Sequence, residues 1–285
     1  MPDFPIIDAH LHIWDPRAIR IGWQAGNAAM RRVFDLDDYA ADTRGIAIEA
    51  MVFVECFVDR GEFLNEVRHV ERAARTEPRL KAIVAQAALE DGADVRPFLD
   101  HLRDHHPLVR GIRRMIEFQP DPDFALRPDF QAGVQMLRDY DYSFEVNVHH
   151  SQMDRAAALS RAVEGVRLVL DHAGKPPIRD GLREPWAGHL RAFAENPDAW
   201  CKLSDLPVEA DHAAWTEDDL RFYIDEVVEV FGFKRMIFAF DWPVCTQAVT
   251  PRRWLDLLDR HFAGVDGSDL RAFYAENARR VYRLD

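Results

Sequence analysis

Apolar residues in this chain follow two alternating patterns. Eight short runs are almost continuously apolar, as expected for strands buried on both faces. The segments between them carry apolar residues at every third or fourth position, which is the spacing of one helix face. Residues 63–74 and 254–262 are examples. The predicted strands cover residues 5–11, 48–56, 81–88, 109–116, 143–149, 166–171, 199–204 and 235–240.

This alternation predicts an α/β fold with parallel strands, because a helical crossover returns each strand in the same direction. Eight such units favour a closed (β/α)8 TIM barrel, which commonly takes a chain of 285 residues as one domain. The alternative is an open doubly wound sheet, whose nucleotide site needs a glycine-rich first turn. Residues 10–16 contain no glycine. We therefore expect one barrel domain over residues 1–285, with longer loops at the carboxyl ends of its strands.

Histidine and aspartate side chains stand where predicted strands end. His10 and His12 close the first strand, His172 follows the sixth, and Asp241 follows the eighth. Side chains two residues apart on a strand share a face, so Asp8 should lie with His10 and orient it. Barrel enzymes carry their active sites at the carboxyl ends of the strands. The pattern therefore predicts that His10, His12, His172 and Asp241 meet at one catalytic centre.

Strand parity also predicts polar groups inside the barrel. Apolar residues take the even positions of the fifth strand and should face the helices, so the odd positions point to the barrel axis. The residues turned inward in this way are Glu145, Asn147 and His149, with Arg113 on the fourth strand and Lys202 and Ser204 on the seventh. Because buried charges must be compensated, Arg113 and Lys202 have two interpretations. They form ion pairs with Glu145 or Glu55, or they bind substrate oxygens.

Residues 14–34 are too long and irregular for a minimal connection between a strand and a helix. Long loops at a barrel mouth often carry function, so this segment is expected to cover a substrate. Its Trp14, together with Trp242 near the last strand, is a candidate substrate contact. Lys175 lies on a loop after the sixth strand and is either a solvated cation or a further contact.

Composition excludes several classes of protein. The net charge of −13 argues against nucleic acid or an anionic membrane as a partner, because both require basic patches. No stretch approaches the roughly 20 apolar residues of a membrane span. The chain has three widely spaced cysteines and no basic region before its first strand. These features predict a cytoplasmic protein with reduced thiols that acts on a small molecule; they do not indicate its oligomeric state.

Five segments, in this order and spacing, resemble the amidohydrolase superfamily. They are Asp8-Ala-His-Leu-His, Gly111-Ile-Arg-Arg, Leu170-Asp-His-Ala-Gly-Lys-Pro, Cys201-Lys-Leu-Ser and Asp241-Trp-Pro-Val. The resemblance spans nearly the whole chain and is strongest to the amidohydrolase 2 branch, which contains sugar-acid lactonases such as L-fuconolactonase and L-rhamnonolactonase. It implies a (β/α)8 barrel that hydrolyses a cyclic ester.

The resemblance also implies roles for individual residues. Asp241 would be the general base, with the three histidines as carbonyl-polarising or metal-binding groups. The implied substrate contacts are Arg113, Lys202, Lys175 and His149. His10, His12, His172 and Asp241 would hold at most one zinc-like divalent ion, because strand four offers Arg113 where two-metal members have a bridging ligand. A reaction with no required metal and a reaction with one weakly bound ion both remain open.

Two departures from the branch flank this expected site. Where the branch usually has Gly-Ser before Asp241, the chain has Ala239 and Phe240; where it usually has glycine after Lys-Leu-Ser, the chain has Asp205. Both can change substrate preference. The sequence also leaves rival functions open: a lactone isomerase, a metal-dependent decarboxylase or hydratase of the same superfamily, or a barrel that binds an anion without turnover.

Overall fold

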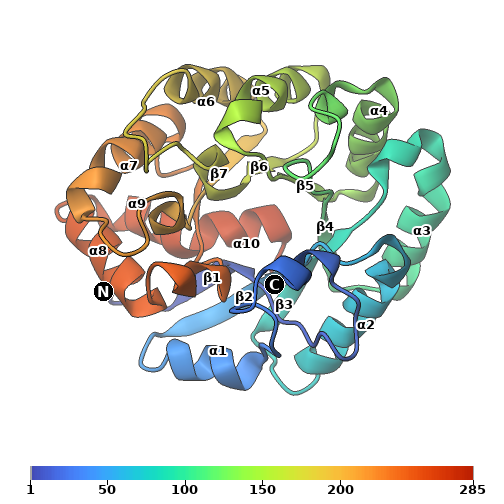
Figure 1. Cartoon of the computed structure of the whole chain (residues 1–285), viewed down its shortest axis with the longest axis horizontal. Coiled ribbons are helices and arrows are strands. Elements are labelled where there is room, and N and C mark those ends of the chain that lie inside the picture. Colours follow the sequence, from blue (N-terminus) through green and yellow to red (C-terminus); the bar gives the residue numbers. More distant parts are fainter. Residues whose placement is uncertain (1, 285) are drawn as a thin grey trace.

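The computed structural model describes residues 2–284 and confirms the predicted barrel. Eight parallel strands follow one another in chain order around the wall, and the helices surround them (Figure 1). The strands are β1 (Ile6–Leu11), β2 (Ile48–Val54), β3 (Leu80–Gln86), β4 (Val109–Arg113), β5 (Ser143–Val146), β6 (Leu168–Leu170), β7 (Ala199–Leu203) and β8 (Met236–Phe238). The helices are α1 (Leu36–Asp42), α2 (Phe63–Ala74), α3 (Arg96–His105), α4 (Pro128–Met136), α5 (Met153–Ala162), α6 (Trp186–Ala194), α7 (Glu217–Phe231), α8 (Pro251–His261), α9 (Gly267–Arg271) and α10 (Asn277–Tyr282).

Every strand overlaps its predicted range, but seven of the eight end at least one residue early. Their last predicted residues leave the sheet and form the loops that carry polar side chains. Among residues 2–284, no helix combines the length and the apolar character that crossing a bilayer requires.

The barrel closes where β1 meets the segment after β8. Leu11 pairs in parallel with Trp242. The His12 amide donates to the Trp242 carbonyl at 2.8 Å, and the Asp241 amide donates to the His10 carbonyl at 3.0 Å. We call this pairing the seam. It fixes residues 10–12 beside residue 241, although more than two hundred positions separate them.

Asp8 stabilises the seam and does not orient the His10 ring, so that expectation was wrong. Its carboxylate accepts hydrogen bonds from the Phe240 amide at 3.0 Å, the His10 amide at 3.2 Å and the Tyr39 hydroxyl at 2.9 Å. The register between β1 and β2 shifts between Asp8 and Leu11. This bulge places one extra residue in β1 and breaks the simple alternation that the prediction assumed.

Two apolar layers support the barrel. The larger lies between the strands and the surrounding helices, and it includes Phe240, which packs edge to face on Phe238. The smaller fills the barrel interior, where residues such as Ile7, Val52 and Ile237 meet Val281 and Tyr282 of α10. This last helix lies across the barrel in Figure 1. These strand residues come before the carboxyl ends of their strands, where His10, His12 and Asp241 lie. The helix α10 therefore closes the amino-terminal end of the barrel.

Gly133 of α4 gives a test of how closely the outer layer is packed. A Cβ at this position would lie 2.2 Å from the Leu89 carbonyl oxygen, a backbone atom. We expect Gly133→Ala to lower the free energy of unfolding by about 1–3 kcal/mol, because the contact forces the backbone apart. Urea unfolding measures the change.

Gly188→Ala in α6 is the matched control. Gly188 is exposed, and its added Cβ would meet only the Glu184 carboxylate at 3.2 Å, which is able to move. Alanine favours helix over glycine by up to about 1 kcal/mol, so this variant should keep or gain stability. Equal stability of the two variants would contradict the close approach of α4 to Leu89.

Candidate active site

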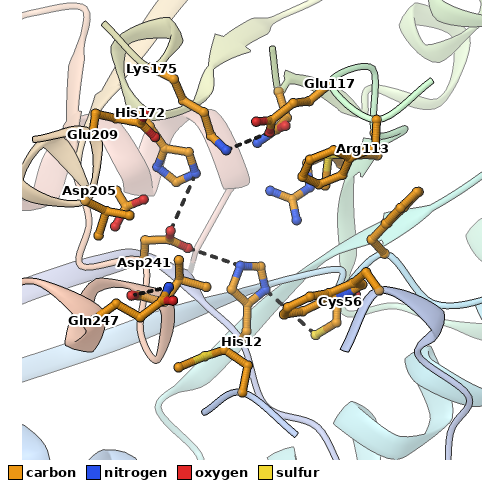
Figure 2. Close-up of a pocket in the computed structure, with 18 of the residues that line it drawn as sticks. His12, Cys56, Arg113, Glu117, His172, Lys175, Asp205, Glu209, Asp241 and Gln247 are labelled. Carbon is orange, nitrogen blue, oxygen red and sulfur yellow. Dashed lines mark hydrogen bonds and ion pairs between the residues drawn. The ribbon is translucent and has the colours of Figure 1, made fainter. Parts of the chain in front are cut away.

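Three imidazoles surround the carboxylate of Asp241 at the carboxyl end of the barrel. The Nε2 atoms of His10 and His12 lie 3.3 Å and 3.1 Å from Asp241 Oδ1. His172 Nε2 lies 3.7 Å from Asp241 Oδ2. Figure 2 shows Asp241 between His12 and His172. The structure thus brings together the four residues that the strand ends singled out, and all four are at least 95% buried.

Left-handed backbone turns two of these side chains into the barrel. Asp241 has φ 62°, His172 has φ 51° and Ala173 has φ 53°. Non-glycine residues rarely adopt this conformation, and its cost persists only where the surrounding structure fixes it. Asp171 and His172 are neighbours in the sequence, yet this turn lets both reach the interior. Strand parity alone does not predict that arrangement.

Hydrogen bonds fix the outer histidines. His12 Nδ1 lies 2.8 Å from the Val54 carbonyl, which only accepts, so Nδ1 carries the proton and donates. His172 Nδ1 lies 2.9 Å from the Ser204 hydroxyl. Burial lowers the pKa of His172 to about 4, despite the opposing effect of Asp241.

His10 contacts charged groups that lie deeper in the barrel. Its Nδ1 lies 3.1 Å from Lys202 Nζ and 3.5 Å from Asp171 Oδ1. Its Nε2 lies 3.3 Å from Arg113 Nη1, so a cationic donor faces each ring nitrogen. Burial, together with Lys202, holds the pKa of His10 well below its usual value.

Asp241 is ionised in this environment. Burial opposes its charge, but His172, His10 and His12 together outweigh that effect and lower its pKa below the usual range. A carboxylate held among imidazoles at the base of a cavity can accept a proton from water or bind a cation.

A network of buried ion pairs lies beneath this centre. Arg113 donates to Glu55 Oε1 at 2.7 Å and to Asp171 Oδ2 at 3.1 Å. Lys202 pairs with Glu145 and lies 3.2 Å from Asp171 Oδ1. Of the two interpretations of Arg113 and Lys202, ion pairing with buried carboxylates therefore describes where both side chains lie. Arg113 also reaches the cavity above, whereas Lys202 is fully buried and does not line it.

A cavity of about 250 Å³ opens above Asp241. Trp14, Trp23 and Met30, from the long segment after β1, cover part of it. Lys175 also lines it, and its Nζ lies 2.6 Å from Glu117 Oε2. The other described residues that line this cavity are His12, Cys56, Phe57, Arg113, Met115, Phe118, Asn147, His172, Asp205, Val208, Glu209, Val244 and Gln247.

Besides Lys202, two predicted contacts lie outside this cavity. His149 is the N-cap of the short helix His150–Gln152, and its Nδ1 lies 2.9 Å from Ser151 Oγ. β5 ends at Val146, so the alternation that turned residue 149 inward no longer applies. Trp242 is fully buried and donates to Asp42 at 2.8 Å. Asp241 and Trp242 are neighbours in the sequence, but the left-handed turn at Asp241 places their side chains in different surroundings.

Four acidic residues of this region were missed as site residues: Glu117, Asp171, Asp205 and Glu209. Glu117, Asp205 and Glu209 follow a predicted strand within six positions and Asp171 is the last residue of one, which was the available signal. Burial raises the pKa of Glu209 to about 7 despite nearby Lys175. Burial and then Asp241 raise the pKa of Asp205 well above its usual value. Of the two departures from the branch, Asp205 lines the cavity and Phe240 does not.

Comparison with known proteins agrees with this geometry. The family model described as amidohydrolase, that of the amidohydrolase 2 family, matches residues 7–284. The chain belongs to this family. An L-fucono-1,5-lactonase of Burkholderia multivorans is 30% identical over 98% of this chain and 96% of its own length. An L-rhamnono-gamma-lactonase of Scheffersomyces stipitis is 24% identical over the full length of both chains.

A solved family structure matches over the whole barrel. It is an amidohydrolase from Burkholderia multivorans with bound zinc, 28% identical, with a TM-score of 0.87 over 99% of this chain and all of that chain. The chain is therefore an amidohydrolase superfamily enzyme with a TIM barrel fold, and its substrate is a separate question.

The residues at the centre fit one divalent ion. Ligand atoms of His10, His172 and Asp241 lie within 4.8 Å of one another and are buried. His12 Nε2 faces the same carboxylate, whereas the hydrogen bond to the Val54 carbonyl involves the other ring nitrogen, Nδ1. Imidazole nitrogen and carboxylate oxygen are ligands suited to zinc. The chain can therefore hold a metal ion here.

The ion-pair network gives a stability prediction. We expect Lys202→Met to lower the free energy of unfolding by about 3–5 kcal/mol, because it leaves Glu145 and Asp171 without this cation in the barrel interior. Lys81→Met is the control, since Lys81 is exposed on β3 and should change stability by less than about 0.5 kcal/mol. Urea unfolding compares them, and similar losses would argue against the network.

Proposed function

We propose that this protein hydrolyses a sugar-acid lactone, with water activated by Asp241. The observation that carries this proposal is an ionised carboxylate among three imidazoles at the base of a cavity. Full-length relatives named as lactonases of two deoxy-sugar acids support the choice of a lactone over other hydrolysable bonds.

The reaction needs a base, a site for negative charge and a proton for the leaving group. Asp241 removes a proton from water while the oxygen of that water bonds to the lactone carbonyl carbon. The tetrahedral oxyanion then collapses, the bond from this carbon to the ring oxygen breaks, and Asp241 returns the proton to the departing alkoxide. The product is an open-chain hydroxy acid, which ionises at neutral pH.

Groups around Asp241 stabilise the oxyanion and hold the substrate. His12 and His172 line the cavity beside the carboxylate, and Arg113 reaches it from β4. Donors aimed at a developing oxyanion are a major source of catalysis. Arg113, Lys175 and Trp14 are the proposed substrate contacts, whereas Lys202 holds His10 from below.

A divalent ion has a defined place in this scheme. His10, His12, His172 and Asp241 would hold it, and when bound it would polarise the carbonyl and lower the pKa of water. Arg113 occupies the strand-four position from which two-metal relatives bridge their ions, so we propose at most one ion per chain.

Replacing the proposed base tests the function directly. We expect Asp241→Asn to lower kcat by about 10²- to 10⁴-fold, because an amide cannot accept the proton of water. Initial rates of lactone opening, followed with a pH indicator, measure the loss.

Asp225→Asn is the control, because Asp225 is exposed on α7, which surrounds the barrel. It should keep the wild-type rate. Circular dichroism of both variants checks that they fold. A folded Asp241→Asn protein with near-normal turnover would reject Asp241 as the base.

Metal binding is tested separately from turnover. We expect dialysis against zinc, followed by elemental analysis, to give one ion per wild-type chain and a clear loss in His172→Ala. A stoichiometry of two would contradict the single-site proposal. Activity before and after chelation then distinguishes the metal-free reaction from the metal-assisted one.

A panel of lactones distinguishes hydrolysis from the rival functions. Hydrolysis releases a proton and gives an open-chain acid by NMR. An isomerase would give a new lactone without acid, and a decarboxylase or hydratase would leave the lactones unchanged and act on unsaturated or aromatic acids. Binding of a lactone without any product would reject the proposed lactonase function.

A further inference from the structure

We propose that Asp205 determines specificity: its carboxylate accepts a hydrogen bond from a substrate hydroxyl, and the cavity selects neutral polyhydroxy lactones over lactones that carry a carboxylate. This inference rests on the proposed lactonase function and narrows its substrate class. It follows from which polar groups of the cavity already have partners and which do not.

The cations of the cavity are already paired. Among its described lining residues, Lys175 and Arg113 are the only lysine and arginine. Lys175 Nζ lies 2.6 Å from Glu117 Oε2. Arg113 uses its guanidinium nitrogens on Glu55 and Asp171. A carboxylate on the substrate would have to compete with these partners, and it gains little from a cation whose charge is already balanced.

Acidic groups outnumber the cations along the same wall. The carboxyl groups that line the cavity belong to Glu117, Asp205, Glu209 and Asp241. Asp241 stays ionised, so a substrate carboxylate brought beside it would be repelled, and repulsion of this kind is an effective way to exclude a competitor. Hydroxyl groups, in contrast, can donate to carboxylate oxygens.

Apart from Asp241 Oδ1, which faces the imidazoles, two buried acceptors of the cavity have no hydrogen-bond partner. They are Asp205 Oδ1 and Asn147 Oδ1, and each residue is only 3% exposed. An unsatisfied buried acceptor is costly, so a ligand that brings donors is favoured at this position. Figure 2 places Asp205 on the same side of the cavity as Asp241. A hydroxyl on a carbon close to the lactone carbonyl would reach Asp205 while the carbonyl lies at Asp241.

The backbone at Asp205 allows an informative replacement. It is left-handed, with φ 61°, a conformation that glycine adopts without strain. Asp205→Gly therefore removes the carboxyl group while keeping the turn, and Asp205→Asn keeps an acceptor oxygen.

The test compares two substrates of equal ring size. One is an aldono-lactone that the wild-type enzyme opens; the other is the aldaric monolactone in which a carboxylate replaces its terminal hydroxymethyl group. We expect wild-type kcat/KM to favour the neutral lactone by at least about 100-fold. Asp205→Gly should lower kcat/KM for the neutral lactone by about 10- to 100-fold, chiefly through KM.

The remaining variants test whether the acceptor oxygen of Asp205 carries the effect. Asp205→Asn, which keeps an acceptor oxygen, should keep kcat/KM for the neutral lactone within a few-fold and leave the preference over the carboxylated lactone unchanged. Asp141→Gly is the matched control, because Asp141 is also left-handed, with φ 57°, but is exposed and outside the cavity. It should leave both substrates unchanged.

The outcomes distinguish this inference from the proposed function. If the wild-type enzyme opens lactones but Asp205→Gly leaves kcat/KM and the preference between the two substrates unchanged, the role of Asp205 is wrong and the lactonase stands. Equal wild-type activity on both substrates would overturn the charge selection. If the wild-type enzyme opens no lactone of the panel, the proposed function fails, and this inference fails with it.

Discussion

The site depends on the pairing between the end of β1 and the segment after β8. Two backbone hydrogen bonds, from His12 to Trp242 and from Asp241 to His10, join the first and last strands of the barrel. Asp8 reinforces this seam with its carboxylate. Without the seam, Asp241 would have no fixed place among the imidazoles, and the cavity above would have no reactive centre.

Charge compensation explains how so polar an interior remains buried. Arg113 and Lys202 pair with Glu55, Glu145 and Asp171 below the histidines. Burial raises the pKa of Glu145 to about 8, which leaves Glu55 and Asp171 as the carboxylates that the two cations balance. Lys202 holds the His10 ring from beneath, and Arg113 also reaches the cavity above. The ion pairs below thus position the histidines, and the histidines and Asp241 above face the substrate cavity.

The sequence predicted the strands, the barrel and the residues that meet at its mouth, because continuous apolar runs and strand ends are local signals. It failed where the backbone leaves regular geometry. The bulge in β1 redirected Asp8, and the early end of β5 left His149 outside the cavity. Asp171 escaped notice because a left-handed turn, and not strand parity, brings it inward beside His172. Such turns depend on tertiary contacts that no single segment encodes.

The last helix, α10, contacts side chains in the barrel interior. Tyr282 reaches from this helix to Glu145, which also pairs with Lys202. During synthesis on the ribosome, residues 10 and 12 emerge long before residue 282. A nascent chain without α10 has an open barrel floor and an incomplete ion network. The support beneath the site is therefore completed after the residues that it supports have been made.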